Sequence, residues 1–391
     1  MDNMGNPPLV NLDPVWGFAL MGMLLASVPL LWWTWRTSQS SALGRWHALA
    51  VVTLFLTFDL VLFGAFTRLT DSGLGCPDWP GCYGSVTPVG AKDHIDAAQA
   101  LMPTGPVTTT KAWIEMIHRK MATAIGALIT VLMGLAFWWR KRLPFGPRLA
   151  VLTFLGVCIQ GAFGAWTVTL KLFPAIVTLH LLGALILLWL LATQVARSAV
   201  ALGHIALLHI QPHLRRWMSA SLALLFVQIT LGAWVSTNYA VLACSEFPLC
   251  QGQWWPPMNF SDGFQIWHEL GKLGNGVTLD MTAVTAIHMT HRCFAMVALA
   301  AMLGLFVHLG REPQLRRLRL ALLGALVLQV ATGLANVVLG WPLLAALVHT
   351  GGAAALVVIH TLLLGTTRSV PQNTEMNANT DVTKRHDRLT A

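Results

Sequence analysis

Residues 113–139 read WIEMIHRKMATAIGALITVLMGLAFWW, and this stretch decides the fold class. Its charged residues stand at one end, where Glu115, Arg119 and Lys120 surround His118. The rest is an apolar run, long enough to cross the ~30 Å hydrocarbon core of a bilayer as a helix. Since ionisable residues are costly inside a membrane and tend to mark function there, the stretch predicts a transmembrane helix with a site near one membrane surface.

Similar apolar runs recur through most of the chain. Of its 391 residues, 55% are hydrophobic and 10% are charged, which is far from the average for soluble proteins. Nine runs are each long enough to span a membrane: 16–35, 48–67, 113–139, 149–170, 175–196, 217–235, 283–309, 320–340 and 343–364. The sequence therefore predicts an all-α polytopic membrane protein.

Basic residues gather between alternate runs, at 36–45, 140–148, 197–216 and 311–319, and in the C-terminal tail. The positive-inside rule predicts that these segments are cytoplasmic. Nine spans then place the N-terminus in the periplasm and the C-terminus in the cytoplasm, in a multi-pass protein of the bacterial cell inner (plasma) membrane. The net charge of +9 is explained by this topology, because the sequence has no soluble domain that could gather it for nucleic-acid binding.

Two cysteine pairs fall in the segments predicted to lie outside the cell membrane, Cys76 with Cys82 and Cys244 with Cys250. Disulfides persist in an oxidising compartment, so each pair is expected to close a small loop. Metal binding by the four thiolates is the alternative, but the spacing is not that of a zinc site.

The chain contains an internal duplication. Three sets of residues recur at nearly constant offsets: Gly64, Cys76 and Cys82 match Gly232, Cys244 and Cys250 at 168; Glu115, His118 and Arg119 match His288, His291 and Arg292 at 173; and Gln160, Gly164 and His180 match Gln329, Gly333 and His349 at 169. Each copy holds four spans, and an even number returns both copies in one orientation, related by a pseudo-twofold axis along the membrane normal. Two parallel-repeat four-helix bundles plus one extra N-terminal transmembrane helix are therefore predicted.

The duplication also sets the predicted domain boundaries. They are 1–47 for the N-terminal segment with the extra helix, 48–197 for the N-terminal four-helix bundle, 198–215 for a cytoplasmic linker, 216–366 for the C-terminal four-helix bundle, and 367–391 for a disordered cytoplasmic tail.

Four histidines lie at matching depths in the two copies, His118 and His180 in the first and His291 and His349 in the second. Two imidazoles at one height on neighbouring antiparallel helices can hold the iron of a flat macrocycle from both faces. Hydrogen bonding between helices by isolated histidines is the alternative. Because the histidines form two matched pairs, the pattern favours two haem sites.

The copies differ at Glu115, three residues before His118, because His288 stands at the matching position of the second copy. Residues three apart share one face of a helix, so this carboxylate is expected beside the edge of any macrocycle that His118 ligates. A carboxylate placed there can accept and donate protons. The alternatives are an interfacial residue near the water boundary or a hydrogen-bond partner of an imidazole, but the absence of the carboxylate from the second copy favours catalysis in the first copy only.

Three arginines are candidates for contacts with haem propionates. Arg119 and Arg292 each directly follow a candidate ligand, and a guanidinium pairs with carboxylates through a rigid fork. Arg68 has Ser236 at its repeat position, so it is a candidate in the first copy only. Snorkelling to the membrane interface is the alternative for each arginine.

Five stretches resemble the haem A synthase family. They are TRLTDSGLGCPDWPGCYG at 67–84, EMIHRKMATAIG at 115–126, LHLLGA at 179–184, MTHR at 289–292 and VHTGG at 348–352. The resemblance spans about residues 48–365. It implies an oxidoreductase acting on a CH group of haem O, which oxidises the C8 methyl group to a formyl group and makes haem A for cytochrome c oxidase. The oxygen would come from water, and the electrons would pass to an acceptor.

By this resemblance the two copies take different haems. The iron of the substrate haem O lies between His118 and His180, beside Glu115 as the catalytic carboxylate. The iron of a permanent haem b lies between His291 and His349. The remaining implied assignments are Arg119 and Arg68 for the substrate haem, Arg292 for a haem b propionate, and the disulfides Cys76–Cys82 and Cys244–Cys250.

Haem O and membrane lipid are the expected partners, and no nucleic acid is expected. Haem O synthase, cytochrome oxidase assembly factors and a second copy of the chain are further candidates. The main alternative function is a di-haem b-type membrane electron-transfer protein without haem-modifying activity, in which Glu115 has no special role. A transporter with parallel repeats, using its histidines as proton relays, is a third reading.

The sequence leaves several features without an assigned role. These are the extra N-terminal helix, Asp59 inside the second span, and His308 and His360, which could form an inner pair but have no histidine at their repeat positions. The electron acceptor is also open.

Overall fold

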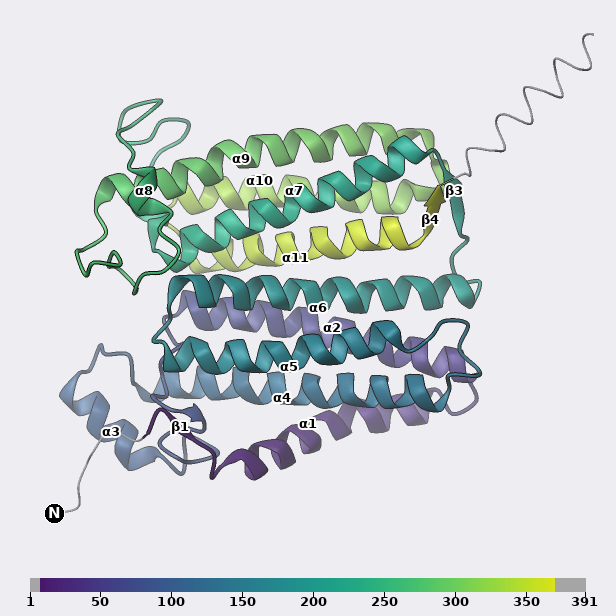
Figure 1. Ribbon diagram of the computed structural model, residues 1–391, viewed down its shortest axis with the longest axis horizontal. Coiled ribbons are helices and arrows are strands. Elements are labelled where there is room, and N and C mark those ends of the chain that lie inside the picture. Colours follow the sequence, from purple (N-terminus) through teal and green to yellow (C-terminus); the bar gives the residue numbers. More distant parts are fainter. Residues whose placement is uncertain (1–7, 370–391) are drawn as a thin grey trace, which may run out of the picture.

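The computed structural model describes residues 8–369. Within this range nine helices are long and apolar enough to cross a membrane, which confirms the predicted all-α polytopic fold. They are α1 (Val15–Arg36), α2 (Ala42–Leu69), α4 (Thr109–Trp138), α5 (Arg148–Thr169), α6 (Pro174–Ala201), α7 (Pro212–Thr237), α9 (Met281–His308), α10 (Arg316–Val338) and α11 (Leu343–Gly365). These helices run alongside one another between two opposite ends of the molecule (Figure 1).

The predicted spans agree with these helices to within a few residues at most ends, but some helices extend further. α2 begins at Ala42, where the Ser41 side chain accepts a hydrogen bond from Gly44 N–H, and α7 begins with Pro212 in its first turn. Hydropathy marks only the part of a helix that lies in hydrocarbon, whereas a helix ends where its terminal groups are capped. For the same reason α6 continues to Ala201, into the predicted linker.

The shorter elements gather at the two ends. One end, which we call the loop face, carries α3 (Lys92–Leu101), the 3₁₀ helix η1 (Ala240–Ala243), α8 (Phe260–Gly263), and the parallel pair β1 (Val10–Asn11) and β2 (Trp79–Pro80). The other, which we call the basic face, carries the 3₁₀ helices η2 (Leu309–Arg311) and η3 (Pro313–Leu315) and the parallel pair β3 (Leu208–Ile210) and β4 (Thr367–Ser369). The basic segments 36–45, 140–148, 197–216 and 311–319 fall at the basic face.

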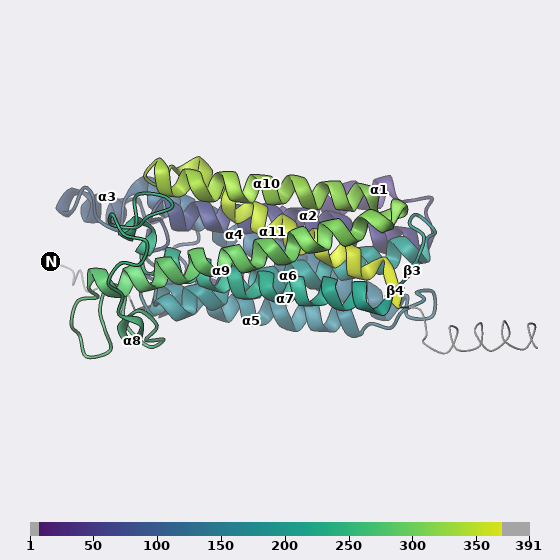
Figure 2. The ribbon, with the colours of Figure 1, turned by 90° about the horizontal axis from the view of Figure 1, so that it is seen from above.

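The helices of the two sequence copies lie in two groups. We call α2, α4, α5 and α6 the first half and α7, α9, α10 and α11 the second half (Figure 1), and in the view from above the second half lies in front of the first (Figure 2). α6 contacts both α7 and α11, and α2 contacts α11, so these four helices form the boundary between the halves. α1 packs mainly against α4. The domain division and the pseudo-twofold axis stay predictions.

The two ends of the chain belong to the predicted N-terminal segment 1–47 and the predicted tail 367–391. Residues Thr367–Ser369, the start of the predicted disordered tail, form β4 beside the segment that precedes α7. The rest of that tail, 370–391, and residues 1–7 lie outside the described residues.

Candidate functional site

One predicted ligand histidine of each half lies against a glycine of the neighbouring helix. A β-carbon placed on Gly64 of α2 would come within 2.9 Å of His118 Cε1, and one placed on Gly232 of α7 within 2.9 Å of His291 Cε1. A larger residue would therefore have to push the imidazole aside. Glycine leaves room for the ring here by having no side chain.

The second histidine of each half repeats this contact. A β-carbon on Gly164 of α5 would lie 3.5 Å from His180 Cε1, and one on Gly333 of α10 would lie 3.1 Å from His349 Cε1. In the first half α4 and α6, which carry His118 and His180, both pack against α2 and α5, and in the second half α9 and α11, which carry His291 and His349, both pack against α7 and α10. Each half thus places its two predicted ligand histidines on helices of one packed group, and each ring faces a glycine at a matching position.

The imidazoles of the first half make no hydrogen bond to any residue that the structure describes. The Nδ1 atoms of both His118 and His180 are buried and have no partner. One face of the His118 ring lies against Phe63, with the rings 6.3 Å apart and nearly parallel. Buried polar atoms in native proteins are nearly always paired, so these two nitrogens are exceptions that call for an explanation.

The second pair has polar neighbours that sequence reasoning did not predict. Gln228 Nε2 lies 3.0 Å from His291 Nδ1, and Thr332 Oγ1 lies 3.1 Å from His349 Nδ1. Gln329, which the duplication did identify, lies 3.3 Å from His349 Nε2. Comparing the copies position by position could have found the other two, because neither residue is repeated in the first half.

The residues present fit a haem at each pair. Among residues 8–369 no three histidine, cysteine or acidic side chains cluster as a metal-ion site. Two imidazoles alone leave most coordination positions of an iron ion empty, so a metal held here must bring its other ligands with it, as a porphyrin does. Paired imidazoles and the glycines that face them supply axial ligands and space for such a group.

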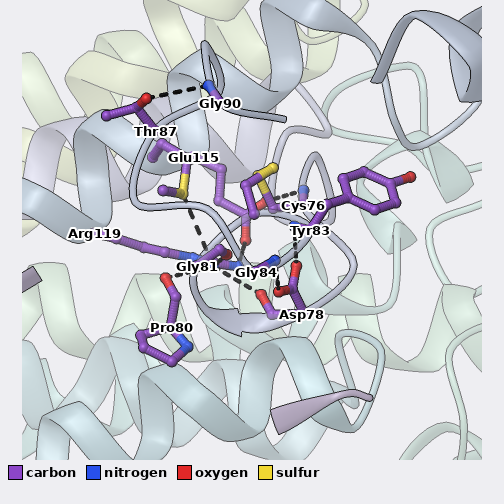
Figure 3. The surroundings of a disulfide bond; sticks show 12 residues. Cys76, Asp78, Pro80, Gly81, Tyr83, Gly84, Thr87, Gly90, Glu115 and Arg119 are labelled. Atoms are coloured by element: carbon purple, nitrogen blue, oxygen red, sulfur yellow. Dashed lines mark hydrogen bonds and ion pairs between the residues drawn. A yellow bond between two sulfur atoms is a disulfide. The ribbon is translucent and has the colours of Figure 1, made fainter. Parts of the chain in front are cut away.

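Glu115 lies in α4, where its side chain contacts the loop that follows α2 (Figure 3). It is buried, with 3% of its surface exposed, and precedes His118 by one helical turn. Its Oε2 accepts a hydrogen bond of 2.8 Å from Cys76 N–H, and its Oε1 is paired with the Arg119 guanidinium. The orientation of the carboxylate is therefore fixed from two sides.

The loop that holds Glu115 is closed by the predicted disulfide between Cys76 and Cys82. Inside it, the buried Asp78 carboxylate accepts hydrogen bonds from Tyr83 N–H at 2.6 Å and Gly84 N–H at 2.8 Å. We call residues 76–84 the first cysteine loop. Arg119 donates to three carbonyl oxygens of this loop, those of Asp78, Pro80 and Gly81 (Figure 3).

The second half repeats this arrangement with different side chains. Cys244 and Cys250 form a disulfide, and Arg292 donates to the carbonyl oxygens of Glu246 at 2.9 Å and Leu249 at 3.1 Å. His288, which replaces the glutamate, donates from Nδ1 to the carbonyl of Ala240 at 2.9 Å. Both arginines predicted to bind propionates thus hold cysteine loops in this structure, and their propionate role stays a prediction.

Arg68 makes its contacts across the boundary between the halves. Its guanidinium donates to the carbonyl of Ser236 at 2.7 Å and to Tyr239 Oη at 3.0 Å, and it lies 4.3 Å from the centre of the Tyr239 ring. The Tyr239 hydroxyl in turn donates to Asp71 at 2.6 Å. Burial raises the pKa of Tyr239, so the phenol keeps the proton that it donates.

The remaining sequence candidates stay apart from the histidine pairs. His308 and His360 each donate from Nδ1 to a carbonyl one turn earlier in their own helix, those of Gly304 at 2.8 Å and Leu356 at 2.9 Å. Within the described range, Asp59 has no hydrogen-bond or ion-pair partner. None of these contacts supports a ligand role.

Comparison with known proteins agrees with this architecture. The family model of the cytochrome oxidase assembly proteins COX15-CtaA matches residues 47–361. A haem A synthase of Shewanella oneidensis is 40% identical over 328 residues, which cover 78% of this chain and 92% of the relative. Haem A synthases of Halalkalibacterium halodurans and Granulibacter bethesdensis are 29% identical over 246 residues (60% of this chain, 73% of the relative) and 27% identical over 351 residues (83% and 87%).

Proposed function

Because the chain belongs to the COX15-CtaA family of cytochrome oxidase assembly proteins, we propose that it is a haem A synthase that oxidises the C8 methyl group of haem O to a formyl group. The observation that carries this proposal is an asymmetry. Both halves hold a pair of histidines cradled by glycines, but only the first half has a buried carboxylate one turn from a histidine. A plain electron carrier would need no such difference.

The reaction places specific demands on the first half. Turning a methyl group into a formyl group adds one oxygen, taken from water, and removes four electrons and four protons. His118 and His180 bind the iron of haem O and so fix the ring, which brings its edge to Glu115 on the same face of α4. Glu115 accepts protons from the methyl carbon and the attacking water, and the electrons pass to an acceptor.

The first cysteine loop serves this chemistry by holding Glu115. Cys76 N–H and Arg119 bind its two carboxylate oxygens, and Arg119 is itself anchored by the loop carbonyls. A general base works only when its oxygen meets the proton at the right angle and distance, so the loop contributes orientation. α1 supports the same helix, because Gly22 lies so close to Thr123 of α4 that a β-carbon there would clash.

In the second half, His291 and His349 are the residues that would hold a haem b. Bound there, it would supply a one-electron carrier. We assign the loop face to the periplasm and the basic face to the cytoplasm, on the charge of the segments at the basic face. Both histidine pairs then lie in the half of the membrane nearer the periplasm.

Identification of the pigments bound to the purified protein tests this proposal. Extracted haems are separated and identified by mass after expression with a haem O source. Haem A, or haem O hydroxylated at the C8 methyl carbon, is expected beside haem b. Haem b alone would contradict the proposal and favour a di-haem electron carrier, and a colourless protein from haem-replete cells would favour the transporter.

A further inference from the structure

The hydroxyl of Thr332 can only accept a hydrogen bond from His349. Thr332 Oγ1 lies 3.1 Å from His349 Nδ1, and it already donates its single proton to the carbonyl of Leu328 at 2.7 Å. The hydrogen bond to His349 therefore requires a proton on Nδ1. A neutral imidazole with its proton on Nδ1 carries its lone pair on Nε2, where it can ligate a metal in place of the contact that His349 Nε2 makes with the Gln329 amide nitrogen at 3.3 Å.

Gln228 can do the same for His291. Its amide nitrogen lies 3.0 Å from His291 Nδ1, whereas its amide oxygen is buried and has no partner. A half-turn of the amide group exchanges the two atoms. The oxygen then accepts a hydrogen bond from Nδ1–H, which leaves the Nε2 lone pair for a metal, in exchange for the 3.3 Å hydrogen bond that the amide nitrogen otherwise donates to the His291 carbonyl.

The first half has apolar residues at both positions. Gln228 precedes Gly232 by four residues, as Leu60 precedes Gly64, and Thr332 directly precedes Gly333, as Phe163 directly precedes Gly164. These glycines contact the same Cε1 atoms in the two halves, so the structure supports the matching of positions. The Nδ1 atoms of His118 and His180 are accordingly buried without a partner.

We propose that Gln228 and Thr332 make the second half retain its haem, and that Leu60 and Phe163 allow the first half to release it. An acceptor on Nδ1 fixes the tautomer and orientation of a ligating imidazole and strengthens its bond to the metal. Without an acceptor, ligation through Nε2 places the proton on a buried Nδ1 that has no hydrogen-bond partner. This unsatisfied N–H weakens the binding of haem. This inference rests on the proposed function, in which one haem is a cofactor and the other must leave as product.

The rate of haem loss from the full-length purified protein tests the inference. Apomyoglobin in excess captures released haem, and mass analysis of the remaining pigment separates haem b from haem O. The double variant Gln228→Leu with Thr332→Val should lose haem b roughly 10–100-fold faster than the wild type, the range over which such partners affect metal affinity. Its haem b spectrum and midpoint potential should shift as well, because the basicity of the ligand changes.

The reverse exchange gives a result that misfolding cannot imitate. Leu60→Gln should slow the loss of haem O by a similar roughly 10–100-fold factor, since it adds the missing partner beside His118. Thr230→Val is the matched control, because the hydroxyl of Thr230 donates only to the carbonyl of Phe226 in its own helix at 2.8 Å. It should leave both rates at the wild-type value.

Two further variants separate this inference from the proposed function. If His291→Ala keeps the wild-type content of haem b, the haem assignment itself is wrong. If His291→Ala loses haem b but the Gln228→Leu, Thr332→Val protein releases it at the wild-type rate, only the inference about these partners is overturned. An unchanged release of haem O from Leu60→Gln would overturn it for the first half.

Discussion

The two halves of the molecule share a scaffold and differ in a few polar side chains around it. Both have a pair of histidines, glycines that make room for the rings, a disulfide-closed loop and an arginine bound to the carbonyls of that loop. Glu115 of the first half occupies the position of His288 in the second. Leu60 and Phe163 likewise occupy the positions of Gln228 and Thr332. The comparison teaches that the duplicated fold positions the histidines in both halves, and under the proposed function the polar neighbours that differ determine the role of each half.

The largest effect is expected from removing one ligand in each half separately. His118→Ala should abolish binding of haem O and formation of haem A while leaving haem b in place, because the pairs lie on different helices. His291→Ala should remove haem b. Pigment content per mole of purified protein measures both, and loss of both haems from either single variant would contradict two independent sites.

Replacing the glycines that face the histidines should have a smaller effect on haem binding, confined to the substituted half. A methyl group on Gly64 or Gly232 would stand 2.9 Å from an imidazole carbon, so the ring must shift, and overpacking of this kind costs about 1–3 kcal/mol. Gly64→Ala should weaken haem O binding and Gly232→Ala haem b binding. Gly126→Ala on α4 is the matched control, because nothing lies within 4 Å of its β-carbon position.

Removing the disulfide of each half in turn should change the rate of haem A formation more than it changes the haem content. Cys76→Ser with Cys82→Ser loosens the loop that orients Glu115, and displacing a catalytic group by about 1 Å can reduce a rate roughly 100-fold. Formation of haem A should fall while haem b stays bound. The same exchange at Cys244 and Cys250 should leave more activity, and equal losses from both would contradict the orienting role of the first loop.

The smallest effect is expected at the boundary between the halves. Tyr239→Phe removes the hydrogen bond to Asp71 and should lower stability by about 1 kcal/mol, measured by thermal unfolding in detergent. Burial raises the pKa of Tyr239, so the folded protein favours the protonated phenol. The stability that the protonated phenol contributes is fully present below the pKa of about 10 that tyrosine has in the unfolded chain. It is lost as the pH rises through the higher pKa of the folded protein. The phenylalanine variant should lack this alkaline loss.

Hydropathy was enough to predict the spans, and the duplication identified four histidines that the structure places against glycines at matching positions. A membrane helix needs a long apolar run, and a repeat places equivalent residues at equivalent depths, so both features are local or periodic in sequence. The helix extensions at Ala42 and Pro212 were missed because capping, not hydropathy, ends a helix.

Partners of long side chains were not predictable in the same way. Arg68 was expected to serve the first half, yet it binds Ser236 and Tyr239 of the second. The propionate contacts of Arg119 and Arg292 stay predictions, and the hydrogen bonds of these arginines to the loops closed by the disulfides were not predicted. Which acceptor a guanidinium reaches depends on how helices and loops pack, and a single sequence does not contain that information directly.

The most direct test of the central claim is the haem product of Glu115→Gln measured beside His288→Gln. Proton transfer by a positioned side chain contributes roughly 10²–10⁴-fold to a rate, so Glu115→Gln should keep haem b, bind haem O and make almost no haem A. His288→Gln, changed at the matching position, should still make haem A. Haem A at the wild-type level in Glu115→Gln would contradict the claim that only the first half is equipped for chemistry.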